Sequence, residues 1–277
     1  MMEDFSDWLN KERVDRYRLD PWPAAAMAAA LGQDEPPLEG APLPLFWHHL
    51  YGLEAVHARD TNRDGHRKRG GFLPPVPLPR RMWAGGRLQF EGDLLVGEEV
   101  TRRSAVRGIT SKAGRTGNLV FVLVEHRLEG AHGRVTEEHD IVYREEAGGE
   151  ETPAWPTAPS AADESIDADP DEVLLFRYSA LTYNGHRIHY DKDYVRNVEG
   201  YPGLIVHGPL LATYLFELLR SRYRQRRVCS FGFRAVQPVF VGDGFSANAA
   251  GNSSDHLDLW IAKRDGTLAM KAEARLA

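Results

Sequence analysis

The apolar stretch GLIVHGPLLATYLFELL, residues 203–219, decides the fold class of this chain. It is interrupted by His207, Pro209 and Glu217, whereas a membrane-spanning helix needs ~20 mostly apolar residues. We therefore interpret it as the core of a buried helix, which we expect over residues 209–226. A helix of this kind needs other elements to cover it on most sides.

The segments after this helix are rich in strand-forming residues. They predict strands at 228–240, 244–253, 256–265 and 268–276. One long buried helix packed against an antiparallel sheet is typical of the α+β class. A further strand is predicted before the helix, at residues 173–182.

The first half of the chain carries a similar set of elements. Residues 7–31 have helical spacing and an alanine cluster, and strand-like runs joined by a turn follow at 119–130 and 135–146. No residue-level repeat links the halves. Between them, residues 145–170 are rich in Pro, Ala, Gly and acidic residues, which is typical of a surface linker. We place a first domain at 1–148, a linker at 149–170 and a second domain at 171–277.

The overall composition excludes several classes of protein. With 277 residues, 42% hydrophobic and 27% charged, the chain can fill a sizeable core, so wholesale disorder is excluded. A formal charge of −6 argues against a dedicated nucleic-acid-binding protein. Cys229 is the only cysteine, so no intrachain disulfide or cysteine metal cluster can form. The polar start of the chain lacks the apolar segment of a signal peptide, and we expect a cytoplasmic protein without membrane association.

The densest cluster of chemically useful residues is YNGHRIHYD, residues 183–191. The glycine-rich segment GYPGLIVHGPL, residues 200–210, follows it and opens the buried helix. Polar side chains on a loop that faces the N-terminus of a helix are a way to build a site for an oxyanion, because the free backbone N–H groups and the positive end of the helix dipole point at developing negative charge. His186 and His189 could bind a metal, but no carboxylate or thiolate completes a familiar spacing, so we predict no metal. His207 either contacts a ligand or is a buried histidine that caps backbone groups.

The same residues resemble the motif of the type 2 enoyl-CoA hydratase (MaoC-like) family. The resemblance rests on Asn184, on His189 five positions later, on Asp191 and on the segment 200–208. It is strongest over residues 176–215 and extends to FGFRAVQPVFVGD at 231–243. Members of this family have the hotdog fold, in which an antiparallel sheet wraps around a long central helix.

The first half resembles one branch of that family. DGHRKRGGFLPPVPLPRRMWAGG, residues 64–86, and GRTGNLVFVLVEHR, residues 114–127, are similar to the N-terminal domain of double-hotdog hydratases that act on mesaconyl-C4-CoA and itaconyl-CoA. The resemblance therefore predicts an α+β double hotdog, with two tandem hotdog domains that each wrap a long central helix. It also implies that the second domain is catalytic and that the first shapes the substrate pocket.

The resemblance implies an enzyme that adds water reversibly across the α,β double bond of a short branched or dicarboxylic acyl-CoA, without a cofactor. Asn184 stands where the widespread motif has aspartate, and an amide cannot accept a proton as a carboxylate does. We therefore expect His189 to be the principal base and Asn184 to hold the water. The backbone N–H of Gly208 is our candidate for binding the enolate oxygen.

Other residues are candidates for binding the substrate. Arg80 and Arg81 could bind a substrate carboxylate, but neighbours on a strand point to opposite faces, so only one is expected to face a pocket. The arginine-rich end of the helix, residues 220–227, either binds CoA phosphates or is a solvated helix end. The remaining candidates are Trp83, Tyr183, His186, His207 and Arg222. Asp191 orients a histidine, serves as a spare base or only caps the loop.

Three alternative functions remain open from the sequence. The chain could be a 3-hydroxyacyl-thioester dehydratase of fatty-acid synthesis, or a non-catalytic acyl-CoA binding protein in which Asn184 marks lost chemistry. A thioesterase is the least favoured, because such sites usually rely on a carboxylate. The oligomeric state is also open: a monomer, a homodimer or a larger homo-oligomer.

Overall fold

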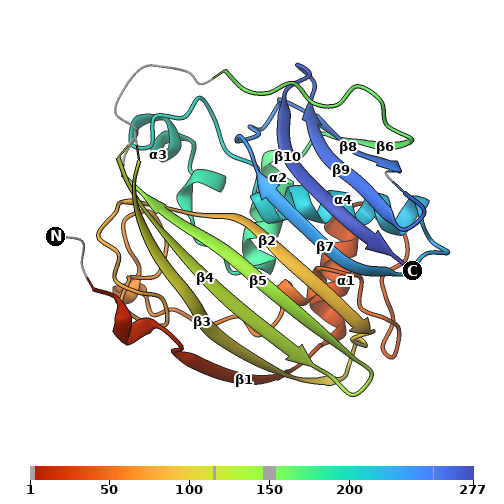
Figure 1. Cartoon of the computed structure of the whole chain (residues 1–277), viewed down its shortest axis with the longest axis horizontal. Helices are drawn as coiled ribbons and strands as arrows, with labels where there is room; N and C mark the ends of the chain where they lie inside the picture. The colour runs from red at the N-terminus through yellow and green to blue at the C-terminus, as the bar shows by residue number, and fades with distance from the viewer. Residues whose placement is uncertain (1–3, 115–116, 146–153, 252) are drawn as a thin grey trace.

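The computed structural model describes residues 4–114, 117–145, 154–251 and 253–277. Its ten strands form one antiparallel sheet in the order β1-β3-β4-β5-β2-β7-β10-β9-β8-β6. Figure 1 shows this sheet curving across one side of the molecule, with α1, α2 and α4 packed behind it. No helix among the described residues is both long and apolar enough to cross a membrane.

The elements have the following bounds. The strands of the first half are β1 (Glu12–Arg18), β2 (Arg80–Gly92), β3 (Glu99–Gly114), β4 (Gly117–Glu129) and β5 (Gly133–Arg144). Those of the second half are β6 (Glu164–Ala168), β7 (Val228–Ala235), β8 (Phe245–Gly251), β9 (His256–Lys263) and β10 (Leu268–Leu276). The helices are α1 (Pro21–Ala30), α2 (Glu172–Leu181), α3 (Lys192–Asn197) and α4 (Gly208–Arg222), and short 3₁₀ turns include η2 (Trp47–Leu50) and η4 (Arg187–His189).

The two halves of the sheet follow one plan. The first half runs β1-β3-β4-β5-β2 and the second runs β6-β8-β9-β10-β7, so each half has an edge strand, a helix and four further strands. The inner strands β2 and β7 pair antiparallel from Gly85↔Arg234 to Gln89↔Ser230 and join the halves. The predicted α+β double-hotdog class is confirmed, except that the described residues of the first half contain no long central helix like α4.

The helix α4 forms the centre of the second half. Leu210, Leu215 and Leu218 are fully buried, and even Glu217 is nearly buried because Arg220 pairs with it. The buried helix predicted over 209–226 is thus present with slightly different ends. The first half differs from the prediction, because the described residues between α1 and β2 contain only short 3₁₀ turns and no second long helix.

The strand predicted at residues 173–182 is wrong, because this segment forms the helix α2. The side chain of Asp171 accepts a hydrogen bond from the backbone N–H of Leu174 at 2.8 Å and caps the helix N-terminus. Leu175 and Tyr178, three residues apart, are buried on one face against the core. The exposed face of this helix carries the apolar side chains of Val173 and Phe176, which obscured the helical pattern in the sequence.

Two other elements also differ from the predictions. Of the predicted helix at 7–31 only Pro21–Ala30 is α-helical, because residues 12–18 form the edge strand β1 paired with β3. The predicted linker contains the edge strand β6, paired with β8, while the proposed boundary at residue 148 lies outside the described residues. Both strands lie at the ends of the sheet, where exposed polar residues leave little hydrophobic pattern.

The first half contains a buried carboxylate between two histidines. Glu137 is 3% exposed, and its carboxylate lies 3.0 Å from Nε2 of His48 and 3.1 Å from Nε2 of His139. Burial raises the pKa of Glu137, but the two imidazoles outweigh this effect and hold the pKa well below its usual value. A carboxyl whose pKa is lowered on folding stabilises the protein above its unfolded pKa, and this stabilisation is lost as the pH falls.

We expect Glu137→Gln to lower the free energy of unfolding by ~2 kcal/mol at pH 7, because the histidines lose a charged hydrogen-bond acceptor. Urea unfolding followed by circular dichroism measures this change. Glu138→Gln is the matched control, because Glu138 is the next residue on β5 and pairs with the half-exposed Arg87, so its loss should cost less than ~1 kcal/mol. Equal effects of the two substitutions would contradict a special role for the buried carboxylate.

Candidate active site

The loop after α2 is held against a loop of the first half by main-chain contacts. The backbone N–H of Arg187 donates to the carbonyl oxygen of Asp64 at 2.9 Å. Gly65 and Gly185 approach so closely that a Cβ on either one would collide with the backbone of the other. Gly65 also has a φ of +88°, which other residues rarely adopt. The site is therefore built from both halves of the chain.

Asn184 is oriented by two hydrogen bonds. Its backbone N–H donates to the carbonyl oxygen of Ser179 at 2.8 Å, and its side-chain Oδ1 accepts from the backbone N–H of His186 at 3.0 Å. Because Oδ1 is engaged, the amide presents its Nδ2 as a hydrogen-bond donor. This geometry suits a group that holds a water molecule rather than one that accepts a proton.

His189 is buried at the end of the 3₁₀ turn η4. Its Nδ1 donates to the carbonyl oxygen of Ile205 at 2.7 Å, so Nε2 carries the free lone pair. The ring stacks on that of His207, with centroids 3.6 Å apart. Burial lowers the pKa of His189 to about 4, and the hydrogen bond to Ile205 opposes this only in part. The imidazole is therefore neutral at pH 7 and can accept a proton.

His207 is fully buried at the N-cap of α4, behind His189. Its Nε2 lies 2.9 Å from Oγ of Ser179, and the ring of Tyr178 lies 4.8 Å away. The hydroxyl of Tyr178 in turn meets Nε2 of His49, from the first half, at 2.9 Å. Burial lowers the pKa of His207 well below its usual value. His207 is buried, as one of the two sequence interpretations has it, but its side chain makes no capping hydrogen bond to α4 and instead packs against His189.

A cavity of about 540 Å³ lies beside Asn184. The second half contributes Tyr183 and Asn184 to its lining, and the first half contributes His66 and Arg81. The ring of His186 lies between this cavity and His189: its centroid is 4.0 Å from that of His66 and 5.5 Å from that of His189. Burial lowers the pKa of His186 to about 2, so it too is neutral.

The two arginines at the start of β2 have different surroundings. Arg80 donates to the carbonyl oxygen of Glu199 at 3.1 Å and to the hydroxyl of Tyr201 at 3.3 Å. Arg81 lines the cavity, and no ion pair of Arg81 is found within the described ranges. Only one of the pair faces the cavity, as the strand geometry predicts, and it is Arg81.

Sequence reasoning missed His66, which lines the cavity from the first half, and its hydrogen-bond partner Asp64. Oδ2 of Asp64 lies 2.9 Å from Nδ1 of His66, and its Oδ1 accepts from the backbone N–H of His66 at 3.0 Å. Burial raises the pKa of Asp64, but the contacts with His66 outweigh this and lower it. The sequence feature that could have indicated this pair is an aspartate two residues before a histidine, in a glycine-rich polar segment.

Asp64 and His66 also belong to a group of residues that could bind a metal ion. Asp64, His66 and His186 each offer one possible ligand atom, and these atoms lie within 4.8 Å of one another. However, both carboxylate oxygens of Asp64 already accept hydrogen bonds from His66. We therefore interpret Asp64 and His66 as a hydrogen-bonded pair, and the absence of a metal stays a prediction.

The model of the family described as hydroxyacyl-thioester dehydratase type 2 matches residues 46–241, which include both loops of the site. The chain belongs to this family. It is 40% identical to mesaconyl-C(4)-CoA hydratase of Chloroflexus aurantiacus over 278 residues, covering 99% of this chain and 98% of that protein. It is 27% identical to the mitochondrial hydroxyacyl-thioester dehydratase type 2 of Schizosaccharomyces pombe, over 70% of this chain and 73% of that protein.

A solved structure agrees with the fold of this chain. A MaoC-like dehydratase from Phytophthora capsici superposes with a TM-score of 0.72 at 14% identity, covering 99% of this chain and 98% of that one. The recognised family is thus confirmed, and the chain is a hydro-lyase by family.

Three further candidate residues lie away from the cavity lining. Trp83 donates from Nε1 to the carbonyl oxygen of Gly85 at 2.8 Å and stacks on His139 in the first half. Arg222 pairs with Glu164 on β6 at 3.4 Å. Asp191 caps α3, because its carboxylate accepts from the backbone N–H of Tyr194 at 2.9 Å. The loop-capping role of Asp191 is therefore the one that the structure supports.

Gly208 begins α4 directly after His207, and a Cβ built on it would meet no atom within 4 Å. Its backbone thus borders open space at the positive end of the helix dipole. Gly208 and His189 do not themselves belong to the lining of the 540 Å³ cavity.

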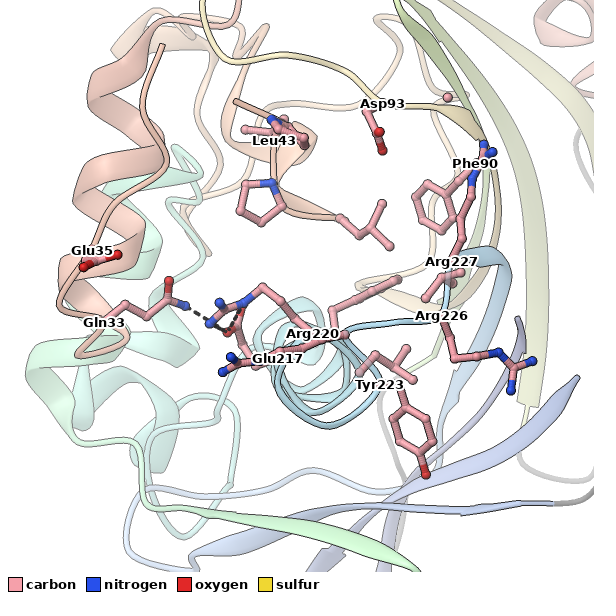
Figure 2. Close-up of a pocket in the computed structure, with 18 of the residues that line it drawn as sticks. Gln33, Glu35, Leu43, Phe90, Asp93, Glu217, Arg220, Tyr223, Arg226 and Arg227 are labelled. Atoms are coloured by element: carbon pink, nitrogen blue, oxygen red, sulfur yellow. Dashed lines mark hydrogen bonds and ion pairs between the residues drawn. The ribbon is translucent and has the colours of Figure 1, made fainter. Parts of the chain in front are cut away.

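A larger cavity of about 910 Å³ lies at the C-terminal end of α4. Figure 2 shows α4 nearly end-on, with Gln33, Glu217 and Arg220 linked by hydrogen bonds. This larger cavity is lined by the residues after α1 and by the start of β7. The smaller cavity is lined in the same way by the residues after α2 and by the start of β2. The two cavities are therefore counterparts in the repeated plan of the halves, and Gly32–Glu35 take the place of the Asn184 loop.

Proposed function

We propose that the chain is a cofactor-free enoyl-CoA hydratase that acts reversibly on a short branched or dicarboxylic acyl-CoA of the mesaconyl-C4-CoA or itaconyl-CoA type. The observation that carries this proposal is the shared cavity, which Asn184 of one half and Arg81 of the other both line. The 40% identity to a mesaconyl-C(4)-CoA hydratase over nearly the whole chain supports the same substrate class.

The chemistry requires a base, a water and a group for developing negative charge. In our proposal Nδ2 of Asn184 donates to the water, and Nε2 of neutral His189 accepts its proton as oxygen attacks Cβ. Charge then develops on the thioester oxygen, and the backbone N–H of Gly208 stabilises it with the aid of the helix dipole.

The position of Arg81 suits a carboxylated substrate. In a mesaconyl-C4 thioester the free carboxylate is bonded to Cβ, the carbon that water attacks. The cation that binds this carboxylate must therefore lie within a few ångströms of the group that holds the water. Arg81 and Asn184 line one cavity, which supports this arrangement.

The direct test is a panel of crotonyl-, mesaconyl-C4-, mesaconyl-C1- and itaconyl-CoA, followed by loss of the enoyl-thioester absorbance. We expect the fastest hydration with a carboxylated ester. Turnover of crotonyl-CoA alone would favour a 3-hydroxyacyl-thioester dehydratase of fatty-acid synthesis, the function named for the 27% identical mitochondrial relative. Binding without turnover would identify an acyl-CoA binding protein. A cytoplasmic location, the lack of a cofactor and self-association into a homo-oligomer remain predictions.

The activity should persist at mildly acidic pH. His189 must be neutral to act as a base, and its pKa is lowered from 6.5 to about 4 by burial, so protonation removes the base only as the pH falls toward 4. We expect the acid limb of kcat/KM to lie below pH 5, measured between pH 4.5 and 9 with circular dichroism as a check on folding. An acid limb near pH 6.5 would instead indicate a solvent-exposed base.

A further inference from the structure

Hydration must also place a proton on Cα, and neither Asn184 nor a bound water supplies an acid for this step. We propose that His66, oriented by Asp64, is a second acid–base residue of the site and transfers the proton at Cα. This inference rests on the proposed function. It assigns a catalytic residue to the first half, and it identifies a carboxylate in the site although the motif position holds Asn184.

The position of the pair is fixed by the main chain. Asp64 binds the backbone N–H of Arg187 through its carbonyl oxygen at 2.9 Å, and the backbone N–H of Asn62 donates to the carbonyl oxygen of His66 at 2.7 Å. The close approach of Gly65 to Gly185 leaves no room for side chains between the loops. His66 is thereby held in the lining of the cavity that contains Asn184.

The hydrogen bonds define which atom of His66 reacts. The carboxylate of Asp64 accepts a hydrogen bond from Nδ1 of His66, so Nδ1 carries a hydrogen. Nε2 of His66 is therefore the atom that exchanges a proton. A carboxylate behind an imidazole orients the ring and stabilises the imidazolium, as in hydrolase triads.

The other histidines around the site lack such a partner. His189 is bonded to a backbone carbonyl and His207 to a serine hydroxyl. The ring of His186 has no hydrogen bond to a carboxylate among the described residues. A proton taken up by this cluster is therefore held best by His66, next to Asp64.

In the proposed reaction His189 and His66 each carry out one proton transfer, and atoms and charge balance. As the oxygen of water bonds to Cβ, its proton passes to Nε2 of His189 and the π electrons move onto the thioester oxygen. The enolate then reforms the carbonyl while Cα takes the proton from Nε2 of His66. His189 releases its proton to solvent and His66 takes one up, and dehydration runs the same steps in reverse.

The charges around His66 link this step to the substrate. Burial lowers the pKa of His66, the hydrogen bond that it donates to Asp64 raises it, and the positive charges of Arg81 and Arg69 lower it, so that the pKa lies below its usual value. Neutral His186 faces it from the other loop. A substrate carboxylate that binds Arg81 offsets one of the effects that lower this pKa, so a dicarboxylic ester favours the protonated form that hydration needs.

The test compares His66→Gln and Asp64→Asn with a matched control, His132→Gln. His132 also contacts a carboxylate, that of Glu98 at 3.3 Å, but it is exposed in the β4–β5 turn, at the opposite end of β5 from the strand end that pairs with Arg80. For each variant kcat and KM are measured with the best ester of the panel. Deuterium incorporation at Cα of the 3-hydroxyacyl-CoA in D₂O reports the proposed step directly.

We expect His66→Gln to lower both kcat and the exchange rate at Cα by at least ~10²-fold, with KM changed less than threefold. Asp64→Asn should lower kcat by ~10-fold and move the alkaline limb of hydration to lower pH, because the pKa of His66 falls without its carboxylate. His132→Gln should match the wild type.

The inference is overturned if folded His66→Gln keeps kcat and Cα exchange within threefold of the wild type. It is also overturned if Asp64→Asn leaves the alkaline limb of the pH profile of hydration unchanged. This measurement does not depend on whether His66→Gln folds. Loss of wild-type activity on dialysis against EDTA, restored by Zn²⁺, would assign these residues to a metal instead. A wild type that hydrates no ester overturns the proposed function itself, which separates the two failures.

Discussion

Replacing His189 with alanine is expected to lower kcat for hydration by ~10²–10⁴-fold, the usual contribution of a positioned general base. The imidazole is buried, neutral and held by the carbonyl of Ile205, so that Nε2 is its accepting atom. No water can take its place with the same orientation and basicity. Steady-state kinetics on the best ester of the panel measure the effect.

His256→Ala is the control for this substitution, because His256 is an exposed histidine at the start of β9. It should leave kcat unchanged. Calorimetric binding of the substrate should persist in His189→Ala, which separates loss of chemistry from loss of the pocket. A folded His189→Ala protein that retains a tenth or more of the wild-type kcat would show that another group is the base.

Replacing Arg81 with methionine is expected to remove the preference for a carboxylated ester. Leaving a bound carboxylate without its cation costs ~2–4 kcal/mol, which corresponds to a ~30–1000-fold loss of kcat/KM with mesaconyl-C4-CoA. Crotonyl-CoA has no carboxylate, so its kcat/KM should change less than threefold. The measurement is the ratio of kcat/KM for the two esters.

Arg80→Met is the matched control, one residue away on the same strand. Arg80 is held by Glu199 and Tyr201, so its loss should lower stability but leave the ratio of the two esters unchanged. If both substitutions reduce turnover of the two esters equally, Arg81 contributes to structure and not to recognition of the carboxylate.

The geometry explains why a first half without its own Asn184-type loop is retained. It supplies His66 and Arg81 to the cavity, and His49 contacts the hydroxyl of Tyr178, whose ring packs against His207. The counterpart cavity at the other end of α4 has Gly32–Glu35 where the Asn184 loop would lie, so chemistry at this end is not expected. The functional unit is therefore the pair of halves.

Local sequence patterns predicted much of the second half. The apolar run of α4 and the strands β7 to β10 lie where the patterns place them, because each buries its side chains with a regular spacing. The strand predicted at residues 173–182 is the helix α2, since a mostly apolar run of ten residues does not distinguish the helical period of 3.6 from the strand period of 2. The edge strands β1 and β6 were missed because little of their surface is buried, so selection for apolar residues is weak there.

The sequence by itself determined the family, the double-hotdog class and the candidates Asn184 and His189, because a motif and a buried helix are short-range features. Only the tertiary structure decided that Arg81 rather than Arg80 faces the cavity, and that Asp64 and His66 join a loop 120 residues further along. The physical reason is that these placements depend on main-chain contacts between distant segments, the bond from Arg187 to Asp64 and the meeting of Gly65 with Gly185. No local periodicity encodes such contacts.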